Sequence, residues 1–154
     1  MKTQPTSGKE GTEIGILGQD FSGSSEVEFG GTTATIIVLS GTTYITAKVP
    51  AGALTGKVTV TTGPITLSSS QTFKVLPTIT KFSPTGGPVG TSVTITGTGL
   101  KQTTKVTFDG KSATFTVNSD TQVTADVPTG AATGKIAVTT KGGSATSATS
   151  FTVN

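Results

Sequence analysis

The side chains that most often perform chemistry in proteins are scarce in this chain of 154 residues. It contains no His, no Cys and no Trp, and all eleven of its cationic side chains are Lys. A nucleophilic hydroxyl needs a base to take its proton, so the absence of His and Cys excludes the common triads. Zinc sites built from His and Cys are excluded for the same reason. We therefore expect no catalytic residue, no cofactor and no metal site.

The acidic residues of the first half could suggest a calcium site, because calcium binds clustered oxygens. They are Glu10, Glu13, Asp20, Glu26 and Glu28. Glu26 and Glu28 stand two residues apart in a segment that reads as a strand, which places both on its outer face. We interpret them as solvated charges. The segments SGKEGT and TGKVTV lack the G-x-x-x-x-G-K-[ST] spacing and the following helix of a phosphate loop.

Charge and hydropathy exclude two further classes of partner. The net charge is +3, but the lysines are scattered singly and there is no Arg. Readers of nucleic acids usually carry Arg for bidentate contacts, so we expect no nucleic-acid partner. The longest apolar run is Ile36–Leu39, far too short to cross a membrane. The amino-terminal segment MKTQPTSGKEG has no apolar stretch typical of a secretion signal.

The chain repeats itself. VPAGALTGKVTVTT, from Val49, and VPTGAATGKIAVTT, from Val127, share ten of fourteen residues at an offset of 78, whereas earlier matches have an offset of 79. One residue is lost where LSGTTY of the first copy aligns with NSDTQ of the second, and a turn tolerates such a deletion. The repeat predicts two domains, residues 1–76 and 77–154.

Within each copy, apolar and polar residues alternate, as in TSVTIT, KVTFDG and SFTVN. Such alternation buries one face of a strand and leaves the other in water. Gly, Pro, Asn and Asp separate the runs, which is typical of an antiparallel sandwich. We predict an all-β fold with the paired Phe29/Phe108 and Phe73/Phe151 in the cores. The inward positions expected in the first copy are Ile14, Ile16, Val27, Phe29, Ala34, Ile36, Val38, Ile45, Ala47, Val49, Val58, Val60, Phe73 and Val75.

The second copy resembles an IPT/TIG domain. The motifs that carry the resemblance are ITKFSPTGGPVGTSVTITGTGL, KVTFDGKSATFTVNSDTQVTADVP and TGKIAVTTKGGSATSATSFTV. The first copy matches through GKEGTEIGILGQDF, VEFGG and ITAKVPAGALTGKVTV. The resemblance implies two tandem immunoglobulin-like β-sandwich domains of the early-set type. The resemblance implies no catalysis. The composition, which is rich in Thr, Ser and Gly and has no Arg or Cys, resembles that of bacterial extracellular modules.

The first copy departs from the pattern at its start, where MKTQ stands in place of ITKFS and Pro5 aligns with Pro84. We therefore expect this domain to lack its first strand. The missing strand would leave an open edge, a template for another segment. We expect the edge to pair with the MKTQP arm, a neighbouring copy or an added peptide.

The first copy also carries apolar residues at positions that we expect to face outward, where the second copy is polar or small. Together with the unmatched Tyr44, they form the candidate partner-binding face: Leu17, Ile37, Leu39, Tyr44, Ile65 and Leu67.

Two functions fit this sequence. The first is a structural spacer and protein-interaction module of a larger bacterial cell-surface or secreted protein. The alternative is an accessory carbohydrate-binding module of a polysaccharide-active enzyme, with Tyr44 as a stacking platform for a glycan. Neither requires membrane insertion.

Overall fold

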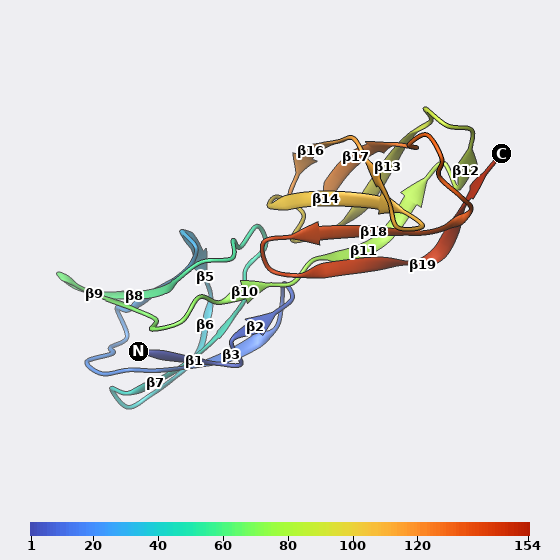
Figure 1. Ribbon diagram of the computed structural model, residues 1–154. Coiled ribbons are helices and arrows are strands. Elements are labelled where there is room, and N and C mark those ends of the chain that lie inside the picture. Colours follow the sequence, from blue (N-terminus) through green and yellow to red (C-terminus); the bar gives the residue numbers. More distant parts are fainter. The chain divides into compact units, whose positions relative to one another are not determined.

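The computed structural model describes all residues, 1–154, and contains strands but no helix (Figure 1). It forms two compact units, Met1–Val75 and Leu76–Asn154. Each unit contains two larger, mainly antiparallel sheets with a hydrophobic core. The prediction of an all-β fold with tandem sandwich domains is confirmed.

The first unit has one sheet in the order β1-β3-β7-β6 and a second in the order β5-β4-β8-β9, with β10 and β2 paired in parallel beside them. The strands are β1 (Lys2–Gln4), β2 (Ser7–Gly8), β3 (Glu13–Leu17), β4 (Glu26–Phe29), β5 (Thr32–Ala34), β6 (Ile36–Ser40), β7 (Tyr44–Lys48), β8 (Val58–Thr62), β9 (Ile65–Ser68) and β10 (Lys74–Val75).

The second unit repeats this plan, and several of its strands are longer. One sheet has the order β11-β13-β17-β16, and the other has the order β12-β19-β18-β14-β15. The strands are β11 (Thr78–Ser83), β12 (Gly86–Gly87), β13 (Ser92–Thr98), β14 (Thr103–Phe108), β15 (Lys111–Ala113), β16 (Phe115–Ser119), β17 (Gln122–Asp126), β18 (Gly134–Thr140) and β19 (Ser144–Val153).

The four phenylalanines that the repeat places in the cores are buried, and within each unit two of them are in contact. Phe29 and Phe73 meet edge to face with ring centroids 5.2 Å apart, and Phe108 and Phe151 do so at 5.3 Å. All four side chains are buried. Such pairs add to the stabilisation from burial alone, since the ring edge of one residue meets the electron-rich face of the other.

The prediction that the first domain lacks its first strand is wrong. Lys2–Gln4 forms β1, which pairs with β3 through Lys2↔Leu17, Thr3↔Ile16 and Gln4↔Gly15. The MKTQP arm therefore pairs with the edge of the sheet, which was one of the three expected partners for that edge. The strand escaped the sequence pattern because its inward residue is the polar Thr3, which is buried at the position of Phe82 in the second domain.

Candidate interaction surface

The outer face of the β1-β3-β7-β6 sheet carries exposed apolar side chains. Leu17 on β3 lies directly opposite Tyr44 on β7. Their chain neighbours Ile16 and Ile45 are fully buried, so Leu17 and Tyr44 point away from the core. Leu17 is 49% exposed and Tyr44 is 38% exposed. The two residues form the centre of an apolar surface on the solvent side of this sheet.

Tyr44 lies across the neighbouring backbone instead of standing free in solvent. A Cβ built on Gly15 would lie 2.7 Å from the Tyr44 hydroxyl oxygen and 3.2 Å from its Cζ. Gly15 thus leaves the space into which the ring folds. At the matching positions the second domain has Thr94 and Gln122. The small residue and the ring occur together in the first domain, and neither occurs at these positions in the second.

A β-bulge changes the expected orientation of two residues on β6. The register shifts between Ile36, opposite Ala47, and Val38, opposite Thr46. Val38, expected inside, is 48% exposed. Leu39, expected outside, packs partly buried against the core. In the second domain the equivalent shift comes later in the strand, between Val117 and Ser119.

The bulge residue Ile37 is 42% exposed, in agreement with its expected exposure. Leu17, Ile37, Val38 and Tyr44 are thus four of the six large exposed hydrophobic residues of the chain, and all four lie on strands of one sheet. We call these four residues the apolar face. Alternation alone could not have included Val38, because the position of a bulge is not visible in a polar–apolar pattern.

The remaining two predicted residues, Ile65 and Leu67, lie on β9 of the other sheet. Ile65 is 52% exposed at the start of this strand. Leu67 pairs with the buried Val60 and packs partly against the core, so its expected outward orientation is wrong. The structure therefore divides the predicted set between two sheets and does not bring all six residues onto one face.

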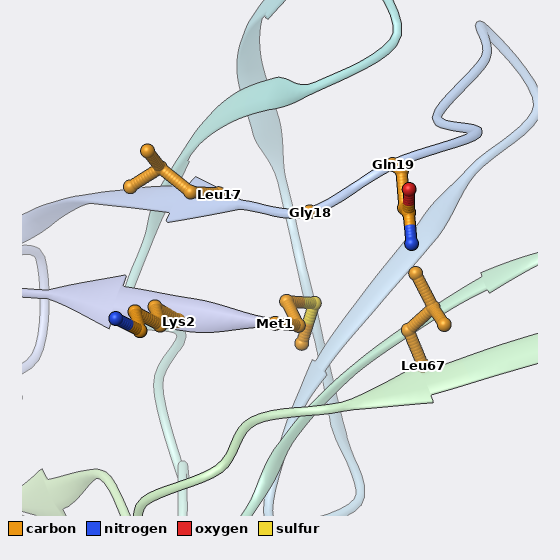
Figure 2. Close-up of a pocket in the computed structure, with 6 residues that line it drawn as sticks. All are labelled: Met1, Lys2, Leu17, Gly18, Gln19 and Leu67. Carbon is orange, nitrogen blue, oxygen red and sulfur yellow. The ribbon is translucent and has the colours of Figure 1, made fainter.

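A cavity of about 300 Å³ lies where the two sheets of the first domain approach each other. Figure 2 shows that Gln19 and Leu67 point toward one another across it, whereas Leu17 points away. Its lining residues are Met1, Lys2, Leu17, Gly18, Gln19 and Leu67. We call this cavity the edge groove. Of the predicted residues, Leu67 points into this groove, and Leu17 borders it with its side chain turned away.

The charged residues form no comparable centre. All eleven lysines are exposed. Glu13 and Lys48 form a surface ion pair at 3.8 Å. No three acidic side chains gather closely enough to hold a metal ion. No helix is present that could span a membrane.

The IPT/TIG domain family matches residues 1–75 and again residues 77–153. The chain belongs to the IPT/TIG family. No curated protein matches the IPT/TIG pair with significance.

Several solved structures are similar to the IPT/TIG pair. The surface glycan-binding protein PbSGBP-B from Prevotella bryantii is 21% identical and has a TM-score of 0.58, with 95% of this chain and 38% of that chain covered. A protein crystallised with a xylogluco-oligosaccharide is 18% identical and has a TM-score of 0.52, with 99% and 40% covered. The plexin A4 extracellular region is 20% identical with a TM-score of 0.49, and 100% and 18% are covered. The chain spans less than half the length of each of these three proteins.

Proposed function

We propose that this IPT/TIG pair is a non-catalytic spacer and protein-interaction module of a larger bacterial cell-surface or secreted protein. The first domain carries the contact surface for a protein partner, and the second serves as a structural spacer. The observation that carries the proposal is the apolar face, because exposed apolar clusters on soluble domains mark interaction sites more often than single exposed residues do.

The difference between the two domains supports this division of roles. Where the first domain has Leu17 and Tyr44, the second has Thr96 and Gln122. By register, Val38 corresponds to Thr116, because Val38 lies opposite Thr46 on β7 and Thr116 lies opposite the equivalent Thr124 on β17. A sandwich of this plan therefore folds with polar residues at these positions, and the fold does not require the apolar ones.

The surroundings of the apolar face favour a protein over a sugar. Leu17, Ile37 and Val38 are aliphatic, and aliphatic side chains pack well against apolar protein surfaces but make no hydrogen bonds to sugar hydroxyls. Tyr44 fits both kinds of partner, because its ring packs against apolar surfaces and its hydroxyl forms hydrogen bonds.

The alternative is an accessory glycan-binding module of a polysaccharide-active enzyme. Two of the solved structures with the same fold are a surface glycan-binding protein and a protein crystallised with a xylogluco-oligosaccharide. In this chain Tyr44 is the one exposed aromatic residue on the sheet that could stack against a sugar ring.

The test replaces three of the four residues of the apolar face with the residues of the second domain, as Leu17→Thr, Val38→Thr and Tyr44→Gln. Immobilised wild-type and triple-variant chains are presented to cell-surface proteins of the source organism, and each retained protein is then purified and titrated. We expect a partner whose affinity falls at least tenfold in the triple variant, because interface energy concentrates in few residues with Tyr prominent among them. The matched control is Val89→Thr, at an exposed apolar residue of the second domain.

A glycan panel separates the two functions. Binding to xyloglucan oligosaccharides that is lost in Tyr44→Gln but retained in Leu17→Thr would support the carbohydrate-binding module. If neither purified proteins nor glycans distinguish the triple variant from wild type, the apolar face is not a contact surface.

A further inference from the structure

The net positive charge of the chain belongs to the second domain. The first unit contains five Lys and five acidic residues, whereas the second contains six Lys and three acidic residues. The whole net charge of +3 is therefore carried by the second unit. Charge of one sign attracts ligands of the opposite sign, so the second domain favours an anionic ligand.

One outer face of the second domain combines lysines with hydroxyl groups and has no carboxylate. It belongs to the sheet that contains β14, β15, β18 and β19, where outward residues alternate with buried ones. The outward residues are Lys105, Thr107, Ser112, Lys135, Ala137, Thr139, Ser144, Thr146 and Ser150. We call this set the lysine face. Asp109 follows β14 at the edge of the face, and Asp120 and Asp126 lie at the other sheet.

The equivalent face of the first domain has the opposite charge. At the offset of 79, Glu26 stands in place of Lys105. Glu28 likewise stands in place of Thr107. The two strands have the same register, because Lys105 lies opposite Thr139 and Glu26 lies opposite the equivalent Thr of β8. One sandwich plan thus accepts either charge at this position, and the fold does not require Lys105.

The two lysines of the lysine face keep their ammonium groups free of protein partners. In the first domain, Lys57 stands at the position of Lys135, and its ammonium group donates a hydrogen bond to the Ser70 carbonyl oxygen at 2.7 Å. Lys135 makes no such bond to the equivalent Ala148. The one ion pair of the chain lies in the first domain. The charges of Lys105 and Lys135 are therefore available to a ligand.

Hydroxyl groups lie on the surface between the two lysines. Lys105 lies opposite Thr139, and Lys135 is four residues before Thr139 on β18, about 13 Å along a strand that rises roughly 3.3 Å per residue. Thr146 lies within this interval on the neighbouring β19, and the Thr139 hydroxyl is 3.0 Å from that of Ser144. Hydroxyls both donate and accept hydrogen bonds. An extended polymer along β18 would thus meet a cation at each end and hydroxyls between them.

The composition of the lysine face distinguishes among anionic partners. A protein partner usually meets apolar and aromatic residues at the centre of an interface, where Lys and Ser are depleted. Single-stranded nucleic acids usually stack their bases on aromatic side chains. The lysine face has no aromatic residue, and its one apolar residue is Ala137. A polysaccharide with acidic groups matches both kinds of contact that the face can make, since it offers negative charges to the lysines and hydroxyls to the threonines.

We propose that the lysine face binds an anionic polysaccharide. Lys105 and Lys135 pair with its acidic groups, and the hydroxyls between them form hydrogen bonds with the sugar hydroxyls. This site adds a glycan contact to the domain that the proposed function treats as a spacer, and it is independent of the apolar face. Because the charges are exposed, each contact is weak, and the affinity depends on several contacts and on ionic strength.

The test measures binding of the 154-residue chain to two immobilised acidic polysaccharides, oligogalacturonate and chondroitin sulfate, by surface plasmon resonance. We expect binding to at least one of them, and none to fully methyl-esterified oligogalacturonate, which has the same sugar without the charge. The affinity should fall at least tenfold as salt rises from about 0.01 M to about 0.15 M, because the Debye length shortens from about 30 Å to about 8 Å. Failure of both acidic polysaccharides to bind would overturn the proposal.

Exchange of charge between the domains locates the site. Lys105→Glu gives the second domain the residue of the first, so the thermal midpoint by circular dichroism should be unchanged while the affinity falls at least tenfold. Lys135→Ser should lower the affinity at least threefold. The matched control is Lys81→Glu, which makes the same change in net charge on the other sheet and should alter the affinity less than twofold. Equal losses in Lys105→Glu and Lys81→Glu would mean that net charge alone attracts the polysaccharide, and the proposed site would be wrong.

Two results would assign the lysine face to another partner and so overturn the proposal. Self-association at low salt in the ultracentrifuge, lost in both Lys105→Glu and Glu26→Lys, would show that the face pairs with the acidic face of another copy. Single-stranded DNA that binds as tightly as the polysaccharides, and competes with them, would show a site that recognises charge alone. None of these variants changes the apolar face, so a failure here leaves the proposed protein partner standing, and the reverse also holds.

Discussion

Tyr44 on β7 folds over Gly15 on β3, so closely that a Cβ at residue 15 would lie 2.7 Å from the Tyr44 hydroxyl oxygen. Glycine in a strand interior usually weakens a sheet, and it often marks a place where another group approaches the backbone. Here that group is an aromatic ring on the solvent side of the sheet. The pair fixes the ring on the apolar face at a defined position, which is what a preorganised contact residue requires.

Gly15→Thr should displace the Tyr44 ring into solvent. We expect stronger quenching of Tyr44 fluorescence by iodide, and displacement of the ring should offset the gain of up to about 1 kcal/mol in unfolding free energy that Thr has over Gly in a strand. The double variant Gly15→Thr with Tyr44→Gln reproduces the residues of the second domain, and without the ring the full gain from Thr should appear. Additive effects in this double-mutant cycle would show that the ring does not lie on Gly15.

Phe108→Ala should unfold the second domain while sparing the first. Phe108 is buried and in edge-to-face contact with Phe151. Truncation of a core Phe costs about 3–5 kcal/mol, and such a loss removes a large share of the roughly 5–15 kcal/mol that stabilises a domain. Circular dichroism should show a transition shifted by more than about 12 °C, since 1 kcal/mol shifts a domain of this size by roughly 4–8 °C. The Tyr44 fluorescence transition should stay in place.

Phe29→Ala is the matched variant in the first domain. It should shift the Tyr44 transition and leave the other one unchanged. A common shift of both transitions in either variant would show that the two units do not unfold independently.

The sequence was enough to predict the repeat, the all-β class and the burial of Phe29, Phe73, Phe108 and Phe151, because burial enforces strict alternation along the central strands. It was not enough where a polar residue takes an inward position, as Thr3 does in β1. It also failed at β6, because one extra bulge residue reverses the orientation of every residue that follows. The Tyr44–Gly15 contact depends on how β3 and β7 are aligned, and a single sequence does not show the register of two strands.

Val38 and Leu39 test the bulge directly. Leu39 packs partly buried against the core, whereas Val38 is 48% exposed. Leu39→Thr should lower the unfolding free energy of the first domain by at least about 1 kcal/mol, since complete burial of a Leu contributes roughly 1.5–3 kcal/mol. Val38→Thr should change it by less than about 0.5 kcal/mol. Urea unfolding followed by Tyr44 fluorescence measures both, and the opposite order would place the register shift elsewhere.

Two buried serines occupy matching positions that alternation does not reveal. The Ser147 hydroxyl accepts a hydrogen bond from the Ile136 N–H at 3.0 Å and donates one to the Thr149 carbonyl oxygen at 2.7 Å. Ser69 makes the equivalent contacts with Val58 and Gln71 in the first domain. Each hydroxyl thus satisfies backbone groups where the strand pairing is interrupted.

Ser147→Ala should destabilise the second domain by about 1–3 kcal/mol, because it leaves the buried Ile136 N–H without an acceptor. Differential scanning calorimetry should show the lower midpoint for the second domain alone, and Ser69→Ala should produce the same effect in the first. Ser150→Ala is the matched control, since Ser150 is exposed on the same strand and should change stability by less than about 0.5 kcal/mol. Equal effects of Ser147→Ala and Ser150→Ala would mean that the buried hydroxyl contributes nothing beyond an ordinary surface serine.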